Sequence, residues 1–338
     1  MDPLLVTIVS FGLIFVVTAA LANGLSITRA SIGGPLKAHR QLNVMMVIGN
    51  FLVLPALLIG LAAMLPFSTQ VKIAVVALAV NAGAPFIPWL VSLARGNLGY
   101  SVASVLLLTV ATIVVLPLTL PPLTHALASS VDISVWTVLW PLLLFIALPM
   151  AVGFVVRARW PQLAAQGLVY LGPISIAFLT VHIVLFMAFT WADVKSIGWA
   201  VVAFAVVFPL AGMLIGYLLS PPYVLSPIPP TDKRRGSKIV SVVATAQQNT
   251  GAAICVAIFA YSKYTIAGDY ILIGALTTIV VVMLVMAELG ERFDKSNPVA
   301  ATPAEAPAPA AGAAPAAAPA PAQIATRPGV AQRAQGDL

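Results

Sequence analysis

The sequence contains little cysteine and little charge. Cys255 is the single cysteine among 338 residues, so no disulfide can form within the chain and no cysteine metal cluster can exist. Charged residues make up 8% of the chain, whereas hydrophobic residues make up 61%. A soluble domain with this composition would expose a large apolar surface to water. The composition therefore predicts a polytopic, all-α membrane protein.

Acidic residues are scarce, and none is expected in the middle of an apolar segment. The ten Asp and Glu residues fall in predicted loops, at segment ends and in the C-terminal tail. No pair of facing acids, nucleophile elbow or HExxH-like spacing is present, and the three histidines are scattered. We therefore expect neither an enzyme nor a bound cofactor, and we leave open Na⁺ as a coupling ion.

Nine apolar segments are long enough to cross a bilayer, if about 20 residues make one crossing. They are residues 4–24, 42–65, 71–94, 98–122, 133–156, 168–191, 197–219, 239–262 and 270–290. An odd number places the termini on opposite sides, and most of the 17 basic residues then share the side of the C-terminus. Because cytoplasmic loops are rich in Lys and Arg, we expect an outside N-terminus and a cytoplasmic C-terminus in a bacterial-type inner membrane. The net charge of +7 thus reports topology in the lipid bilayer, and nucleic-acid binding is not expected.

Residues 297–338 differ from the rest of the chain in being rich in proline and alanine. Frequent proline prevents a long helix, and no large side chains recur to build a core. We expect a transmembrane domain over residues 1–296 and a disordered cytoplasmic tail over residues 297–338. Residues 220–231, which also contain several prolines, are predicted to be a stiff connector.

A run of four polar side chains interrupts the eighth apolar segment. Gln247, Gln248, Asn249 and Thr250 precede Gly251, and an unsatisfied amide in hydrocarbon costs several kcal/mol. Hydrogen bonds between helices are the simpler explanation, but four consecutive residues cover every face of a helix. We interpret the run as a broken helix that lines a solute or ion site.

A second interruption, residues 81–88, lies inside the third apolar segment. Asn81, Gly83, Pro85 and Pro88 stand where a helix would cross mid-membrane, and proline removes helical hydrogen bonds. The two interrupted segments are five apart and so cross in opposite directions. This spacing predicts an inverted repeat that pairs residues 4–122 with residues 168–290, as in many secondary transporters.

Four short stretches resemble the bile acid:sodium symporter family, which includes bacterial organic-anion carriers. Together the likeness covers roughly residues 5 to 290, and the stretches occur in the family's order. The resemblance implies a ten-helix fold, or a nine-helix form, with a panel domain beside a core domain that contains two crossing broken helices. The stretches are Gly24 to Ile27 (GLSI), Gly49 to Pro55 (GNFLVLP), Leu93 to Asn97 (LARGN) followed by Ser101, and Gln248 to Gly251 (QNTG).

The family's sodium ligands are only partly present. Family members typically hold sodium with a glutamate four residues before the motif's glutamine, and here that position is Ala244. Ile87 and Pro88 replace a Ser-Asn pair that supplies further ligands in the family. By the same resemblance, Asn50 and Gln248 match positions that provide amide oxygens. Thr109 or Thr112 is then placed to supply a hydroxyl.

His182 is the one ionisable side chain expected near the middle of a segment. An intramembrane histidine can relay protons because its unperturbed pKa is about 6.5. The simpler alternative is a neutral histidine bonded to a neighbouring carbonyl. The sequence leaves both readings open.

Taken together, the sequence predicts a secondary transporter of a small organic anion that works by alternating access. The predicted site comprises Asn81, Gln247, Gln248, Asn249 and Thr250, with Asn50 and Thr112 lining it and His182 as a proton relay. The N-terminal ends of the half-helices would face the anion. Alternatives are an uncoupled or proton-coupled carrier and a non-transporting sensor or scaffold. No pattern indicates an oligomeric state.

Overall fold

A computed structural model describes residues 3–190, 198–220, 232–263 and 265–296, and within these ranges every regular element is a helix. Eight of its helical stretches are long and apolar enough to cross a membrane. The third predicted crossing is not one of these eight stretches, because it is divided into two short helices. The sequence predicted this interruption. The prediction of an all-α polytopic membrane protein is confirmed. The expected tail and most of the expected connector lie outside the described residues.

The helices follow one another through the chain with few long connections. Those of the first half are α1 (Pro3–Ser26), α2 (Arg29–Ala38), α3 (Arg40–Ile48), η1 (Gly49–Val53), α4 (Leu54–Met64), α5 (Thr69–Ala79), α6 (Ile87–Leu93) and α7 (Leu98–Leu127). Those of the second half are α8 (Val135–Leu142), η2 (Leu143–Ala147), α9 (Leu148–Arg159), α10 (Pro161–Phe189), α12 (Trp199–Leu218), α13 (Asp232–Ala246), α14 (Thr250–Cys255), η4 (Val256–Ala260) and α15 (Thr265–Ser296). The segments labelled η are π-helical.

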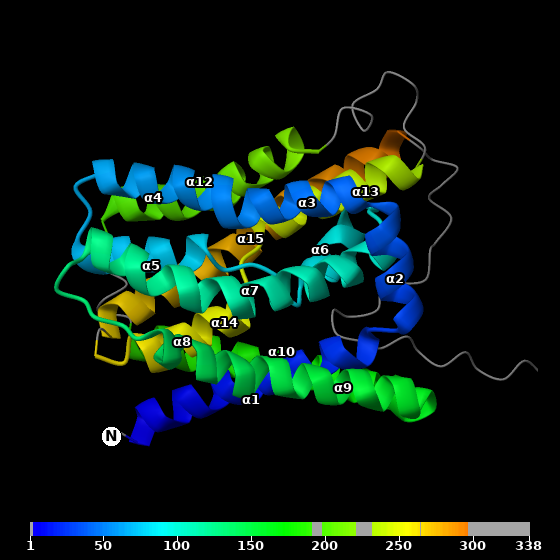
Figure 1. Ribbon diagram of the computed structural model, residues 1–338, viewed down its shortest axis with the longest axis horizontal. Helices are drawn as coiled ribbons and strands as arrows, with labels where there is room; N and C mark the ends of the chain where they lie inside the picture. Colours follow the sequence, from blue (N-terminus) through cyan, green and yellow to red (C-terminus); the bar gives the residue numbers. More distant parts are fainter. Residues whose placement is uncertain (1–2, 191–197, 221–231, 264, 297–338) are drawn as a thin grey trace, which may run out of the picture.

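Two groups of helices build the molecule (Figure 1). Helices α1, α9 and α10 pack against one another along one side, and α8 and η2 precede α9 in the same helical stretch; we call these five elements the panel. The remaining crossings, from α3 to α7 and from α12 to α15, form the second group, which we call the core. Helix α14 of the core contacts α1 and α8 of the panel. Both interrupted helices therefore belong to the core, and the second of them contacts the panel through α14.

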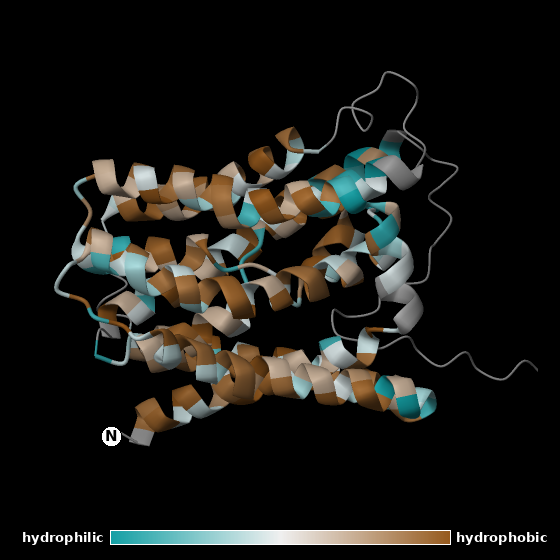
Figure 2. Cartoon of the chain, viewed as in Figure 1, coloured by the Kyte–Doolittle hydropathy of each residue, from teal (hydrophilic) through white to brown (hydrophobic). Residues whose placement is uncertain are grey.

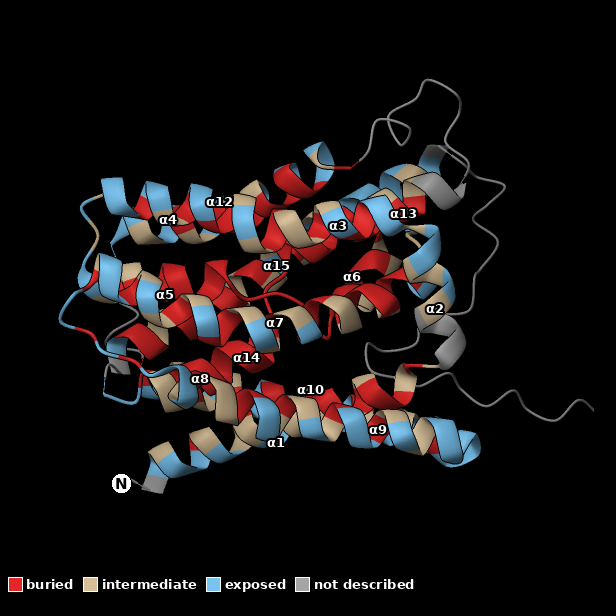
Figure 3. Ribbon diagram, viewed as in Figure 1, coloured by how far each residue is buried: buried red, intermediate tan, exposed pale blue. Residues whose placement is uncertain are grey.

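Apolar side chains cover the outer faces of the crossing helices. Leu52, Val184 and Leu284 are each more than 60% exposed, as expected for side chains that contact lipid. Hydrophobic residues cover most of the length of the helices, whereas hydrophilic residues gather at the ends of α9 and α13 (Figure 2). Burial is concentrated where α5, α6, α13 and α14 meet inside the molecule (Figure 3).

Glycines let α12 lie directly against α13. A Cβ at Gly212 would lie 2.7 Å from the Cα of Ala246, and a Cβ at Gly216 would lie 2.6 Å from the carbonyl oxygen of Ser241. The GxxxG spacing is typical of close packing between membrane helices. This contact positions the end of α13, where the second interruption begins.

An ion pair joins the first interrupted helix to the last helix. Arg95, directly after α6, has a φ of 57° and donates two hydrogen bonds to the Asp294 carboxylate, at 3.1 and 2.7 Å. The arginine of the LARGN stretch thus fixes the end of α6 on α15. Helix α15 also begins earlier than the predicted crossing at residue 270, so Asp269 lies within its second turn and not in a loop.

Candidate functional site

The two interruptions cross and bond to each other through their asparagines. Asn81 Nδ2 donates to the carbonyl oxygen of Asn249 at 2.9 Å, and Asn249 Nδ2 donates to the carbonyl oxygen of Gly83 at 3.0 Å. The Asn249 side chain thus satisfies a carbonyl within the first interruption, whereas the carbonyl of Asn249 also accepts from the N–H of Ala253 at 2.9 Å and takes its second hydrogen bond from Asn81. The sequence placed both residues in interruptions, and the structure brings them together.

Helix α7 holds the first interruption from the other side. Thr112 Oγ1 donates to the carbonyl oxygen of Ala82 at 2.9 Å and accepts from its N–H at 3.0 Å. Thr109 Oγ1 donates to the carbonyl oxygen of Gly83 at 2.9 Å. The two hydroxyls replace helical hydrogen bonds that the interruption removes. Thr112 thus supports the crossing, and its oxygen already has two backbone partners.

Local sequence explains why both helices stop and restart at these points. Gly83 has a φ of +84°, a conformation that glycine adopts without steric cost. Pro88 occupies the first turn of α6, where the missing N–H has no helical partner to lose. In the second interruption, Asn249 caps α14, because its Oδ1 accepts from the N–H of Ala252 at 3.1 Å.

Most of the unsatisfied polar atoms in the interior belong to this crossing. Among the residues that the structure describes, six buried side-chain nitrogen or oxygen atoms have no hydrogen-bond partner. They are Asn81 Oδ1, Gln247 Oε1, Gln248 Oε1, Gln248 Nε2, Thr250 Oγ1 and His182 Nε2. Each such atom costs about 1–3 kcal/mol when it stays unpaired. A cluster of this kind is typical of a site where water, an ion or a solute completes the bonding.

The side-chain nitrogen of Asn50, in contrast, takes part in bonds within the protein. It lies in η1, and its Nδ2 donates to the carbonyl oxygen of Met46 at 2.8 Å and approaches Thr245 Oγ1 at 3.4 Å. Thr245 stands in the last turn of α13, so Asn50 meets the helix just before the interruption. The neighbouring Ala244 is fully buried.

Sodium would meet only neutral ligands at this crossing. The amide oxygens of Asn81, Gln247 and Gln248 are unpartnered and are of the kind that binds Na⁺. The hydroxyls of Thr109 and Thr112 are already bonded to the first interruption. Among the described residues, no carboxylate lines the crossing. Any sodium ion bound here would therefore rely on uncharged oxygens alone.

A small crevice separates the crossing from the panel. It has a volume of about 20 Å³ and lies where α1 and α9 approach both interruptions. Residues of the core that line it include Pro85, Thr109, Asn249 and Gly251, and residues of the panel that line it are Phe15, Val16, Ala19, Ala20, Asn23, Ile146 and Met150. The panel residues were not predicted from the sequence, because except for Asn23 they are ordinary apolar residues of membrane-crossing helices.

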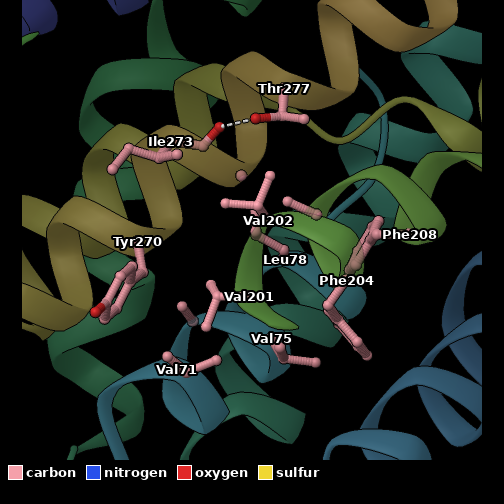
Figure 4. Close-up of a pocket in the computed structure, with 13 residues that line it drawn as sticks. Val71, Val75, Leu78, Val201, Val202, Phe204, Phe208, Tyr270, Ile273 and Thr277 are labelled. Atoms are coloured by element: carbon pink, nitrogen blue, oxygen red, sulfur yellow. Dashed lines mark hydrogen bonds between the residues drawn. The ribbon is translucent and has the colours of Figure 1, made fainter. Parts of the chain in front are cut away.

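A larger cavity, of about 220 Å³, lies elsewhere in the core (Figure 4). It is lined mainly by aliphatic and aromatic side chains of α5, α12 and α15, among them Val71, Phe204 and Ile273. The hydroxyl of Thr277 donates to the carbonyl oxygen of Ile273 and is not free for a ligand. This cavity therefore does not match the predicted anion site.

His182 lies on α10 in the panel and is 4% exposed. Its Nδ1 lies 2.9 Å from the carbonyl oxygen of Ile8 on α1. The structure thus bears out the bond to a neighbouring carbonyl that the sequence left as one alternative. The other ring nitrogen, Nε2, has no hydrogen-bond partner, so the bond to Ile8 satisfies only one of the two ring nitrogens.

One comparison with known proteins gives a match. The sequence model of a family described as the sodium bile acid symporter family matches residues 10–197, more than half of the chain. The matched region runs from α1 to the end of α10 and includes the first interruption. No curated protein sequence matches the chain.

Proposed function

The chain belongs to the sodium bile acid symporter family, and from this premise we propose that it carries a small organic anion across the membrane by alternating access. The family and the apolar helices together identify a multi-pass membrane transporter of the bile acid symporter type. Members of this family are transporters and not enzymes. The class of solute, the coupling ion and the residues of the site are proposed here and do not follow from the family alone.

The observation that carries the proposal is the set of unpartnered amides at the crossing. Gln248 Nε2 is a free donor that can bond an anionic group, and Gln247 and Gln248 also offer free acceptors. The adjacent crevice is lined by Phe15, Val16 and Met150, which suit the apolar body of an organic acid. Movement of the panel against the core would open this crevice to either side in turn.

The distribution of positive charge supports a cytoplasmic C-terminus. Arg157 and Arg159 end α9, Arg292 and Lys295 end α15, and hydrophilic residues gather at these ends and at the start of α13 (Figure 2). Positive residues mark the cytoplasmic side of membrane proteins. We propose the inner membrane of a bacterial-type cell, with the N-terminus outside.

Replacement of Gln248 with alanine is expected to lower the rate of solute uptake at least about tenfold. A hydrogen bond from the side-chain amide to a charged group contributes about 1.5–3 kcal/mol. The free energy of unfolding should not fall, because both polar atoms of the Gln248 side chain have no partner within the protein. The measurement is initial uptake of tritiated taurocholate into proteoliposomes, together with the Tm of the purified variant.

The matched control is Gln166→Ala, which removes an exposed glutamine of α10. Uptake by this variant should equal that of the unmodified protein. Normal uptake by Gln248→Ala would contradict the placement of the site. Unmodified protein that takes up no more taurocholate than protein-free vesicles would contradict transport of bile-acid anions.

A sodium-specific rise in Tm is not expected for the unmodified protein. The crossing offers neutral oxygens only, and Ala244 stands where a carboxylate would balance the charge of the ion. An ion at a hundredfold excess over its Kd adds about 2.7 kcal/mol to the stability of the folded state. The measurement compares thermal unfolding in sodium and potassium chloride at matched ionic strength. A clear difference would show that amides and carbonyls suffice to hold sodium.

A further inference from the structure

Two residues that each carry an unpartnered polar atom line a common cavity between the panel and the core. His182 Nε2 comes from α10 and Thr250 Oγ1 from the first residue of α14. The cavity has a volume of about 10 Å³, which is close to the space that a single water molecule needs. The rest of its lining is apolar and consists of Leu179, Phe186, Ile254, Leu272 and Leu276.

Contacts with α1 fix the position and the tautomer of the His182 ring. A carbonyl oxygen only accepts hydrogen bonds, so the 2.9 Å contact with Ile8 requires a proton on Nδ1. In the neutral ring, Nε2 then carries a lone pair and no proton. Gly12 makes room for this arrangement, because a Cβ there would lie 2.9 Å from both Cε1 and Nδ1 of the ring. The ring of Phe186 lies nearly parallel to the imidazole, with the two ring centroids 6.1 Å apart.

No charged group accompanies His182 in this cavity. Within the described residues, α1 carries no titratable side chain, and α14 carries only the buried Cys255. Titratable residues elsewhere on the neighbouring elements do not line the cavity; they are Tyr170 on α10, Arg157 and Arg159 on α9, and Asp269, Tyr270, Glu288, Glu291, Arg292, Asp294 and Lys295 on α15. An imidazolium ring would therefore stand among apolar side chains and one hydroxyl.

We propose that His182 is a proton-binding site at the contact between the panel and the core, completed by Thr250 and one water molecule. The proton moves from a hydronium ion to the lone pair of Nε2 and forms an N–H bond, and water is the product. In the neutral form, the water donates a hydrogen bond to Nε2 and accepts one from the Thr250 hydroxyl. In the charged form, Nε2–H donates to the water or to the hydroxyl oxygen.

Protonation would favour separation of the two groups of helices. A buried cation without a paired anion is unfavourable, and the penalty falls when water enters the contact. Proton binding thus favours an arrangement in which α10 has moved away from α14. This consequence rests on the proposed alternating access, whereas the site itself does not. His182 would supply the coupling charge that Ala244 lacks.

The site is tested directly by nuclear magnetic resonance of ¹⁵N-histidine-labelled protein in nanodiscs. The chain has three histidines, so loss of one set of signals in His182→Gln assigns the ring. At about pH 8 we expect a neutral ring with the proton on Nδ1. Thr250→Val should shift the Nε2 signal of His182, and Thr250→Ser should leave it close to its original position. A proton on Nε2 of the neutral ring, or an unchanged signal in Thr250→Val, would overturn the site.

The role in transport is tested by the pH dependence of taurocholate uptake. Between about pH 5.5 and 8, the initial rate should change at least about threefold for the unmodified protein and stay flat for His182→Gln. His125→Gln, at an exposed position near the end of α7, should retain the pH dependence. A pH dependence that persists in His182→Gln overturns the coupling. Absence of any uptake with the expected resonance signals contradicts the proposed function and supports the site.

Discussion

Replacement of Gly83 with alanine is expected to lower the free energy of unfolding by about 2–5 kcal/mol. The residue has a φ of +84°, which costs a residue with a Cβ about 1–2 kcal/mol. The new Cβ would also lie 2.7 Å from Thr109 Oγ1 and closer still to the N–H of Thr109. Overpacking against a backbone that cannot yield adds about 1–3 kcal/mol. Thermal unfolding of the purified variant measures the loss.

The same substitution should also abolish uptake, because Gly83 joins both interruptions. Its carbonyl oxygen accepts from Thr109 on α7 and from Asn249 in the second interruption. The control is Gly60→Ala in α4, where an added Cβ meets nothing within 4 Å. Alanine in a helix is favoured over glycine by about 0.5–1 kcal/mol, so this variant should be at least as stable as the unmodified protein. Equal stability of the two variants would contradict the role assigned to Gly83.

The interruptions were predictable from the sequence because they break strong local rules. Glutamine, asparagine and proline in the middle of an apolar segment have few explanations other than a break. Their pairing was not predictable, since the bonds between Asn81, Gly83 and Asn249 join residues far apart in the chain. The contact of the Asn50 side-chain nitrogen with Thr245 likewise joins residues far apart in the chain.

Features that depend on tertiary packing could not be read from local patterns. The π-helical segments η1 and η2 each end just before a helix with proline at its second position, Pro55 in α4 and Pro149 in α9. Proline cannot donate the usual helical bond, and a wider π turn accommodates its ring. The prolines were visible in the sequence, but they do not specify whether the helix kinks or widens. Gly12 gave no signal at all, because only the ring of His182 makes it necessary.

Replacement of Ala244 with glutamate is expected to make stability depend on sodium. Ala244 is fully buried in the last turn of α13, four residues before Gln248 of the interruption. In potassium chloride, the new carboxylate would be buried without a partner, and such a charge costs about 3–5 kcal/mol. In sodium chloride, the ion would join the carboxylate to the free oxygens of Gln247 and Gln248. The recovered stability should reach about 2.7 kcal/mol at a hundredfold excess over Kd.

The control for charge is Ala244→Gln, because a glutamine side chain has nearly the volume of a glutamate side chain but carries no charge. Both variants must fit a larger side chain into a packed position, so the steric cost appears in each and cancels in the comparison. Only the glutamate variant should melt at a higher temperature in sodium than in potassium. The difference should also vanish in Ala244→Glu combined with Gln248→Ala if the amide is a ligand.

Failure of sodium to stabilise the glutamate variant would carry its own conclusion. The new carboxylate would then face oxygens that are too far away or too firmly held to complete a sodium site. The loss of the family's glutamate would in that case be only one of several changes that removed sodium binding. In that case the crossing would have departed from ion binding as a whole, and its free amides would serve the solute alone. Coupling would then have to come from a titratable group elsewhere in the membrane. Within the described residues His182 is the buried candidate with an unpartnered ring nitrogen.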